Sequence, residues 1–245
     1  MKALVLCGGF GTRLGILGRN VSKPLIEIGK RAVLSRTIDK LDEVDEIDEI
    51  VISTNRKFEG DYQKWIKKQN IGKKITLFVE PADSAEKKLG AVAAVDYALR
   101  EKKISDDLIL IMGDNLFSFD LSHFTSQFRR LKTPCHVVYD IGSREKAKLF
   151  GVPQVSESLI TRVIEKPRHT SSTLVCTGIY FLTVDSLKLI SEYLEKSEKK
   201  DRLGDFMSWF VERTPVHAFH GNGTWFDIGD SESLKEARRW VEKGG

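Results

Sequence analysis

The sequence predicts an α/β fold in which a mixed, mostly parallel sheet is flanked by helices and carries added hairpins in its C-terminal half. Three observations point to this fold. Short apolar runs alternate with amphipathic stretches through the first half of the chain. These runs are almost continuously apolar, which is typical of strands buried on both faces of a parallel sheet. In the second half, strand-like runs follow one another with short connections, which indicates hairpins.

Each expected element of the first half rests on its own pattern. The apolar runs predict strands at 2–7, 49–54, 74–80 and 108–115. Helical spacing of apolar residues predicts helices at 33–44, 58–69 and 84–102. In the first of these helices, Leu34, Ile38 and Leu41 fall on one face, which we expect to be buried.

The second half changes character but needs no separate domain. Strands are predicted at 136–141, 151–156, 159–165, 174–182 and 216–221. Helices are predicted at 186–196, 204–213 and 231–243. Glu157 and Ser158 are expected to form the turn of a hairpin. No linker rich in proline, glycine or serine divides the chain, so we expect a single domain over residues 1–245 with two lobes.

The composition excludes several classes of protein. The net charge of +4, from 39 basic and 35 acidic residues, is too mild for a nucleic-acid-binding face and suits an anionic small molecule. The three cysteines form no CxxC pair, so neither a zinc site nor a disulfide framework is indicated. No apolar run is long enough for a signal peptide core or a membrane span. We therefore expect a cytoplasmic protein that binds neither nucleic acid nor membrane.

The sequence CGGFGTRLG, residues 7–15, directly follows a strand-like run and has three functional interpretations. A dinucleotide-binding loop would need a third glycine, but Leu14 stands where it would open the helix. A Walker-type loop would need GxxxxGK, which is absent. A triphosphate-binding loop would use backbone N–H groups of the glycines, with Arg13 as an added fork of donors. A tight turn without any ligand explains the same glycines.

Two further residues suit phosphate chemistry. Pro24 is expected to hold Lys23 in an extended conformation, from which the ammonium can present a point charge to a phosphate. An exposed lysine before a proline can equally have no role. Asp114 ends an expected strand, and ligands of α/β sheets lie at the carboxyl ends of strands. A turn residue or a helix cap is the structural alternative for Asp114.

A series of short motifs in a fixed order resembles the sugar-phosphate nucleotidylyltransferases, also called sugar-1-phosphate pyrophosphorylases. The motifs are GGFGTRL (8–14), KPL (23–25), MGDN (112–115), FGV (150–152), IEKP (164–167), TGIYFL (177–182) and WFDIGDSESL (225–234). Each motif is short, but the ordered series spans nearly the whole chain. Within the family the chain is most similar to the glucose-1-phosphate thymidylyltransferase group.

The resemblance implies a fold, a reaction and an arrangement of lobes. The fold would be the Rossmann-like sheet of nucleotide-diphospho-sugar transferases. A nucleoside triphosphate (NTP) and a sugar 1-phosphate would give a nucleoside diphosphate (NDP) sugar and pyrophosphate, by in-line attack at the α-phosphorus. The favoured substrates are dTTP or UTP with glucose 1-phosphate. Residues 1–118 would mainly bind the nucleotide and residues 119–245 the sugar phosphate, with no C-terminal β-helix domain.

The resemblance also assigns roles to individual residues. Arg13 and Lys23 would be catalytic, and Asp114 and Asp227 would hold Mg²⁺. The nucleotide would be bound by Gly8, Gly9, Gly11, Thr12, Arg13, Glu80, Gly90 and Asp114. The sugar phosphate would be bound by Gly151, Glu165, Lys166 and Gly178. Surface ion pairing, helix capping and plain turn glycines are the structural alternatives for these residues.

The base of the nucleotide is left open by Glu80. Thymidylyltransferases commonly have a glutamine near this position, which both donates and accepts. An ionised glutamate only accepts, either from the N3–H of thymine or uracil or from the N1–H and N2–H₂ of guanine. A guanylyltransferase acting on mannose 1-phosphate, or a cytidylyltransferase, is therefore the alternative within the family. A catalytically silent, nucleotide-sensing regulatory subunit and a dinucleotide-dependent dehydrogenase are alternatives from other classes. The family often forms homo-oligomers, so self-association is possible here.

Overall fold

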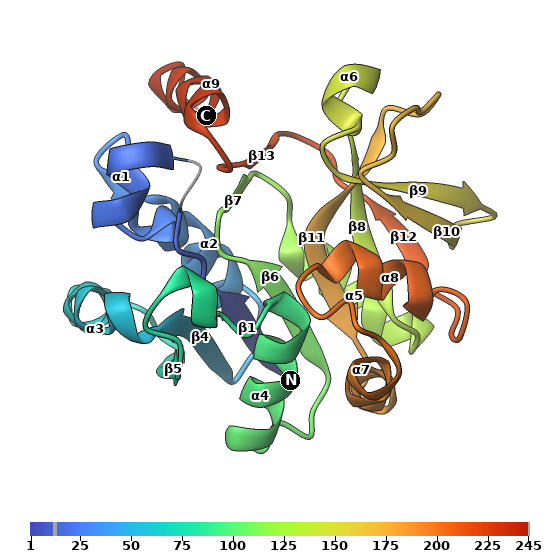
Figure 1. Ribbon diagram of the computed structural model, residues 1–245, viewed down its shortest axis with the longest axis horizontal. Helices are drawn as coiled ribbons and strands as arrows, with labels where there is room; N and C mark the ends of the chain where they lie inside the picture. Colours follow the sequence, from blue (N-terminus) through green and yellow to red (C-terminus); the bar gives the residue numbers. More distant parts are fainter. Residues whose placement is uncertain (12–13, 245) are drawn as a thin grey trace. The chain divides into compact units, whose positions relative to one another are not determined.

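The computed structural model describes residues 1–11 and 14–244, which form two compact units (Figure 1). The first unit takes its described residues from Met1–Lys88, Ile111–Ser122 and Gly223–Gly245, and the second from Leu89–Leu110 and His123–Asn222. The segments of the two units thus alternate along the chain. The assignment of nucleotide binding to 1–118 and of sugar-phosphate binding to 119–245 stays a prediction.

Parallel strands form the centre of the first unit. The order β5-β4-β1 is parallel throughout, with Lys2 opposite Glu49 and Glu49 opposite Lys74. Ala3, Leu4 and Val5 of β1 are fully buried, as expected for a strand covered on both faces. The strands of this unit are β1 (Lys2–Leu6), β2 (Glu27–Ile28), β3 (Arg31–Ala32), β4 (Glu49–Asn55), β5 (Lys74–Glu80), β7 (Asn115–Phe117) and β13 (Trp225–Asp227).

The helices of the first unit bury the apolar faces that their sequences carry. Leu34, Ile38 and Leu41 of α2 have no exposed surface, which confirms the predicted buried face. Leu234 and Ala237 of α9 belong to the same core cluster as residues of β2 and α2. The helices are α1 (Gly15–Asn20), α2 (Val33–Asp42), α3 (Glu59–Ile66) and α9 (Ser231–Glu242). Short 3₁₀ turns occur at η2 (Lys23–Leu25), η3 (Arg56–Phe58) and η4 (Ala85–Lys87).

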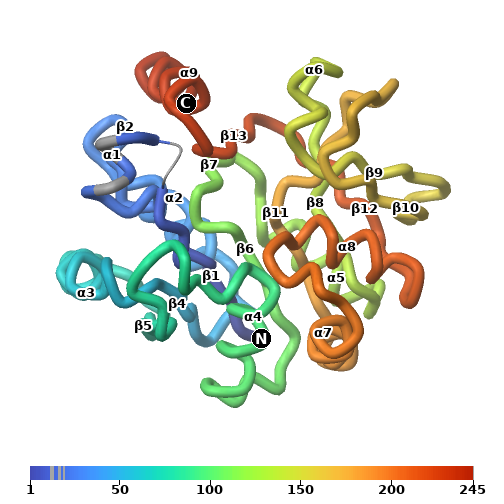
Figure 2. The backbone as a smooth tube through the Cα atoms, viewed as in Figure 1, coloured from blue at the N-terminus to red at the C-terminus, as the bar shows by residue number. Residues whose placement is uncertain are grey.

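The predicted strand 108–115 is two strands in the structure. β6 (Leu108–Met112) ends where the Gly113 N–H donates to the Leu6 carbonyl at 2.8 Å, and β7 begins at Asn115. β7 then pairs antiparallel with β13, with Asn115 opposite Asp227. Figure 2 shows this C-terminal strand beside the middle of the chain. The pairing brings together two polar segments that are far apart in the sequence.

The second unit contains a mixed sheet, as the sequence predicts. Its strand order is β11-β8-β12-β10-β9, in which β12 is parallel to β8 and the other pairs are antiparallel. The predicted hairpin is confirmed, because Glu157 and Ser158 form its turn with φ values of +48° and +67°. The strands are β8 (Cys135–Asp140), β9 (Gly151–Ser156), β10 (Leu159–Glu165), β11 (Leu174–Leu182) and β12 (His217–His220).

Helices of the second unit pack on this sheet through aromatic side chains. Phe124 of α5 stacks on Phe219 of β12, with 5.3 Å between ring centroids, and Phe128 lies 5.7 Å from Phe181 of β11. The helices are α4 (Ala91–Glu101), α5 (Leu121–Leu131), α6 (Arg144–Ala147), α7 (Val184–Lys196) and α8 (Leu203–Phe210). No helix within 1–11 and 14–244 is both long and apolar enough to cross a membrane. The α/β class predicted from the sequence is confirmed.

One predicted helix was wrong over its first third. The helix predicted at 84–102 begins only at Ala91, and the residues before it contain the short turn η4. Gly90 has a φ of +86°, and a Cβ at this position would meet the Lys200 carbonyl oxygen at 2.7 Å. This left-handed conformation cannot continue a right-handed helix, so the helix starts after it. The other predicted element boundaries agree with the structure to within three residues.

Candidate active site

A cavity of about 360 Å³ lies in the first unit, at the carboxyl ends of β1 and β6. The glycine-rich loop after β1 forms one part of its wall, and the η2 turn, the η4 turn and the residue after η4 form others. The lining residues are Leu6, Cys7, Gly9, Phe10, Gly11, Lys23, Pro24, Ala85, Lys88, Met112 and Asp114. Four residues expected to bind the triphosphate or its metal, namely Gly9, Gly11, Lys23 and Asp114, therefore border one cavity.

Lys23 is largely buried and has two partners from distant parts of the chain. Its Nζ lies 3.6 Å from Asp114 Oδ2 and donates to the Gly229 carbonyl at 3.3 Å. The expectation that Pro24 keeps Lys23 extended was wrong. Lys23 opens the η2 turn, in which the Ile26 N–H donates to the Lys23 carbonyl at 3.0 Å. Proline is compatible with the first turn of a helix because its missing N–H is not needed there.

Asp114 and Asp227 lie on neighbouring segments of the first unit. The Ile228 N–H donates to the Asp114 carbonyl at 2.9 Å, directly beyond the pairing of Asp227 with Asn115. The Asn115 side chain donates to the Met112 carbonyl at 2.9 Å and accepts from the indole N–H of Trp225. These contacts fix the backbone on both sides of the two predicted metal ligands.

The two carboxylates are suitable donors for a hard divalent cation. Mg²⁺ commonly binds to one or two carboxylates and completes its shell with water and phosphate oxygens. In the part of the chain that the structure describes, no group of three or more His, Cys, Asp or Glu side chains could hold a metal ion. A cation held by Asp114 and Asp227 would therefore depend on substrate and water for its other ligands.

Glu80 lies beneath the glycine loop rather than on the cavity wall. A Cβ at Gly8 would overlap the Glu80 carboxyl group, so the Glu80 side chain would have to shift if another residue stood at this point of the loop. The Gly8 carbonyl accepts from Asn55 Nδ2 at 3.0 Å, and Glu80 Oε1 accepts from Ser53 Oγ at 2.7 Å. Burial raises the pKa of the Glu80 carboxyl, against the lowering effect of the Ser53 hydrogen bond.

Two residues with expected roles in binding the triphosphate, Thr12 and Arg13, lie outside the described residues.

The residues expected to bind the sugar phosphate belong to the second unit. Glu165 ends β10 opposite Gly151, and its carboxyl packs so tightly on Gly204 that a Cβ there would overlap it. Lys166 follows with a φ of +48°, and its N–H donates to the Phe150 carbonyl at 3.0 Å. Gly178, also in this unit, lies in β11 with a φ of +81°. Gly90, which was expected to bind the nucleotide, is likewise part of this unit.

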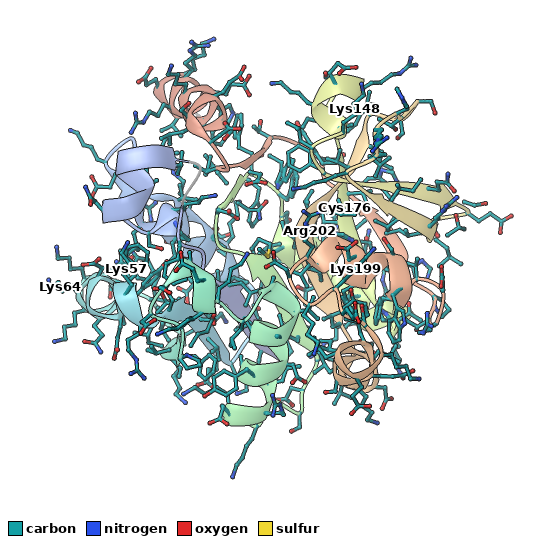
Figure 3. All side chains as sticks on the ribbon, viewed as in Figure 1. Lys57, Lys64, Lys148, Cys176, Lys199 and Arg202 are labelled. Atoms are coloured by element: carbon teal, nitrogen blue, oxygen red, sulfur yellow. The ribbon has the colours of Figure 1, made fainter. Side chains whose placement is uncertain are left out.

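Charged neighbours surround Glu165 within the second unit. Burial is the main cause of its raised pKa. The charge of Asp205 also raises this pKa, whereas the cations Lys166 and Arg202 lower it. Figure 3 labels Arg202, at the start of α8, and Cys176 on β11. The Glu165 charge in turn contributes to the raised pKa of the Cys176 thiol, which burial mainly causes.

Several cavity residues escaped the sequence analysis. Phe10 and Met112 stand within recognised motifs but had no assigned role, and Ala85 and Lys88 lie in the segment that was predicted to be helical. Behind the cavity wall, the hydroxyl groups of Ser22 and Tyr62 are hydrogen-bonded at 2.8 Å in a fully buried position. A long-range contact of this kind leaves no periodic signal in the sequence.

Comparison with known proteins identifies the family. The family model described as nucleotidyl transferase matches residues 2–244. The chain belongs to this family. The bifunctional protein GlmU of Methanococcus aeolicus is 28% identical to this nucleotidyl transferase over 247 residues, which cover 99% of this chain and 55% of that relative. The chain thus spans about half the length of this relative.

Two further relatives of this nucleotidyl transferase are matched over most of their length. The glucose-1-phosphate thymidylyltransferase of Neisseria meningitidis is 25% identical, with 99% of this chain and 83% of the relative covered. A solved structure from Bacillus anthracis, assigned as a glucose-1-phosphate thymidylyltransferase and bound to a sucrose, has a TM-score of 0.85. It is 25% identical and covers 98% of this chain and 95% of its own. Members of the family generally depend on a divalent metal.

Proposed function

We propose that this chain is a sugar-1-phosphate nucleotidylyltransferase, which converts an NTP and a sugar 1-phosphate into an NDP-sugar and pyrophosphate. One observation carries the proposal. The ammonium of Lys23 and the carboxylate of Asp114 lie 3.6 Å apart in a cavity bordered by the glycine loop, and the Ile228 N–H, next to Asp227, donates to the Asp114 carbonyl. Cations, glycine N–H groups and paired acids are the groups that phosphoryl transfer needs.

The reaction requires positioning and charge neutralisation rather than a strong base. An oxygen of the sugar phosphate attacks the α-phosphorus in line, and the bond between the α-phosphorus and the oxygen that bridges to the β-phosphate breaks. The electron pair of that bond leaves with pyrophosphate, and the nucleophile is already anionic, so no proton has to be removed first. Lys23 neutralises the α-phosphate during this step, and Arg13 stabilises the leaving pyrophosphate. Backbone N–H groups of Gly8, Gly9, Gly11 and Thr12 hold the triphosphate.

Asp114 and Asp227 would hold the divalent metal, which we propose is Mg²⁺. When bound, the metal supplies positive charge that offsets the charge of the phosphates. The residues of the chain orient these carboxylates through the contacts around Asn115 and Ile228. The partial burial of Asp114 and the neighbouring ammonium of Lys23 keep the carboxylate in one place.

The sugar phosphate would be bound by residues of the second unit. Lys166 carries the charge that pairs with the phosphate, and Glu165 accepts a hydrogen bond from a sugar hydroxyl. Gly151 and Gly178 leave room for the sugar next to the backbone. Burial raises the pKa of Glu165, so its carboxyl group is partly shielded from water. A hydrogen bond from a sugar hydroxyl would replace the water that burial removes.

Among the possible substrates, we favour dTTP or UTP with glucose 1-phosphate. The thymidylyltransferase relatives support this choice, and Glu80 and Gly90 would contribute to nucleotide binding. An ionised Glu80 would accept from the N3–H of thymine or uracil, or from the N1–H and N2–H₂ groups of guanine, and the second option keeps a mannose-1-phosphate guanylyltransferase as the alternative. A cytoplasmic location and self-association stay predictions from the sequence.

A panel of four NTPs against glucose 1-phosphate and mannose 1-phosphate tests the proposal. With Mg²⁺ present, pyrophosphate release is expected with one preferred pair and is expected to require the sugar phosphate. The Asp114→Asn variant serves as the inactive control. Nucleotide binding without pyrophosphate release from any pair would instead favour a regulatory protein.

A further inference from the structure

Tyr62 of α3 has a buried hydroxyl group that the proposed mechanism does not use. Its side chain has no exposed surface, and its hydroxyl is hydrogen-bonded to Ser22 Oγ at 2.8 Å. Ser22 is equally buried, and the two residues lie 40 positions apart in the sequence. A buried hydroxyl group is costly unless it is paired, so this contact restricts where α3 and Ser22 can lie relative to each other.

Ser22 directly precedes Lys23 at the start of the η2 turn. The Ser22 carbonyl accepts from the Leu25 N–H at 2.9 Å, which closes this turn. At the other end of the lysine side chain, the ammonium lies 3.6 Å from Asp114 Oδ2 and donates to the Gly229 carbonyl at 3.3 Å. Lys23 is therefore held at its backbone through Ser22 and at its ammonium through contacts in the cavity.

Tyr62 also contacts the start of the glycine loop. Cys7 is the first residue of that loop, lines the cavity and is itself buried. Burial raises the pKa of the Cys7 thiol, and a hydrogen bond with the Tyr62 hydroxyl acts in the opposite direction. The Cys7 N–H donates to the Ser53 carbonyl of β4 at 2.7 Å, so the backbone at Cys7 is fixed to the sheet. One hydroxyl group thus connects the residue before Lys23 with the start of the glycine loop.

We propose that Tyr62 is a positioning residue, which sets the place of Lys23 relative to the glycine loop through its contact with Ser22. The inference rests on the proposed function, in which Lys23 neutralises the α-phosphate while the loop holds the triphosphate. A displacement of about 1 Å can slow an enzyme about 100-fold, so small shifts of a catalytic cation matter. Tyr62 does not line the cavity, so its effect should appear in kcat rather than in NTP binding.

Two single variants and their combination test this role in the whole chain. Tyr62→Phe and Ser22→Ala each remove one hydroxyl and leave the other buried without this partner, which should lower the Tm. The double variant removes both hydroxyls, so its Tm is expected to lie closer to that of the wild type. The kcat of all three variants, measured well below the lowest Tm, is expected to fall about tenfold to a similar level, because each breaks the same bond. Calorimetry should find the dissociation constants of dTTP, UTP and GTP changed by no more than about twofold.

Ser35→Ala is the matched control. Ser35 is also a buried serine whose hydroxyl contacts an aromatic side chain of α3, since it accepts from Trp65 Nε1 at 3.2 Å. It does not line the cavity, so the variant is expected to keep the wild-type kcat although it loses this contact. If Ser35→Ala slowed the reaction as much as Ser22→Ala, any loosening of α3 would have the same effect, and the inference would be overturned.

The chemical reactivity of Lys23 provides a readout that does not need turnover. Formaldehyde with a borohydride reductant methylates lysine side chains, and mass spectrometry of peptides gives the rate at each lysine. Lys23 is only 8% exposed, so it should react slowly in the wild type. Tyr62→Phe and Ser22→Ala are expected to raise its rate several-fold, because the local structure that shields it opens more often. Lys64, on the exposed face of α3, should react at the wild-type rate in every variant.

The two readouts separate this inference from the proposed function. Faster methylation of Lys23 in the Tyr62 and Ser22 variants of a protein that never releases pyrophosphate would support the positioning role while the transferase proposal fails. Unchanged methylation of Lys23 would overturn the inference even in an active enzyme. A kcat that followed the Tm, and so recovered in the double variant, would show that the hydroxyl contributes to stability alone and would overturn it as well.

Discussion

The ammonium of Lys23 donates a hydrogen bond of 3.3 Å to the carbonyl of Gly229, which lies 206 positions later in the sequence. The same ammonium lies 3.6 Å from Asp114. Both contacts hold the charge at the edge of the cavity, where an incoming phosphate would meet it. The proposed role of Lys23 is therefore one of a fixed cation, and this has a kinetic consequence.

Replacing Lys23 by methionine should reduce kcat far more than it weakens NTP binding. A fixed charge that acts on the α-phosphate mainly stabilises the transition state, so we expect kcat to fall about 10²- to 10³-fold. The dissociation constant of the NTP should change only a few-fold. Steady-state kinetics and calorimetry measure the two quantities. Lys64→Met, on the exposed face of α3 (Figure 3), is the control, and equal losses in kcat and binding would contradict the role.

The isosteric variants Asp114→Asn and Asp227→Asn should each abolish turnover that depends on Mg²⁺. An amide keeps the shape of the carboxylate but removes the negative charge that a hard cation needs. Initial rates over a Mg²⁺ titration check this expectation. Asp106→Asn, at an exposed position, should behave like the wild type. Full Mg²⁺-dependent activity in either variant would remove that residue from the metal site.

Glu80→Gln should stabilise the protein at neutral pH. Burial raises the pKa of the Glu80 carboxyl above its ordinary value of 4.5, so the folded state binds the proton more tightly than the unfolded state. The stabilisation by this proton is complete below 4.5 and is lost as the pH rises through the higher folded pKa. The glutamine needs no proton, so its advantage in urea unfolding should grow with pH over that window. A constant difference from pH 4 to 8 would contradict the raised pKa.

The same variant tests the choice of nucleotide. A glutamine at position 80 both donates and accepts, which suits the imide edge of thymine and uracil, whereas the carboxylate only accepts and can take two hydrogen bonds from guanine but one from thymine or uracil. If Glu80 contacts the base, Glu80→Gln should raise the ratio of kcat/KM for dTTP or UTP over GTP. Ser53→Ala removes the hydroxyl that donates to Glu80 and leaves the carboxyl in place, so it is the control for indirect effects. An unchanged ratio would leave Glu80 with a structural role beneath Gly8.

His136 should make the protein less stable at mildly acidic pH. Its side chain is fully buried and stacks on Tyr180 at 4.2 Å, and neither ring nitrogen has a partner among the residues the structure describes. Burial lowers its pKa from 6.5 to about 3. The contribution of the neutral His136 to the free energy of unfolding is therefore fully present above pH 6.5. It falls as the pH decreases toward 3, because the unfolded state binds a proton at His136 and the folded state does not.

His136→Phe retains the stacked ring and removes this proton. Its Tm should fall less than that of the wild type between pH 6.5 and 4. His169→Gln, at an exposed position, is expected to leave the pH dependence of the Tm unchanged. Parallel Tm curves for His136→Phe and the wild type would show that another group governs the acid sensitivity.

The elements that could be predicted from the sequence are those whose structure depends on neighbouring residues. The hairpin around Glu157 and Ser158 was predicted because its strands and turn are consecutive in the sequence, and β4 and β5 because their runs are apolar. The pairing of β7 with β13 could not be predicted in this way. Each of these strands has only three residues, and their contact depends on the fold of the whole unit.

The same distinction applies to the candidate site. The glycine loop and Lys23 could be proposed from local sequence, whereas Asp227 entered only through the resemblance to a family. Lys88 was missed because its segment has helical spacing, which the left-handed conformation of Gly90 overrides. Tertiary contacts, here with the backbone of Lys200, outweighed the local propensity.

The alternation of the two units along the chain has a consequence for synthesis. Chains are made from the N-terminus, and domains generally fold as their residues become available. The glycine loop, Lys23 and Asp114 are made before the segment His123–Asn222 of the second unit, but Asp227 and the carbonyl of Gly229 follow only after it. A ribosome-bound chain that stops before β13 would therefore carry the glycine loop and Asp114 without the second acid of the proposed metal site. The proposed site is complete only when β13, which follows the whole second unit, has paired with β7.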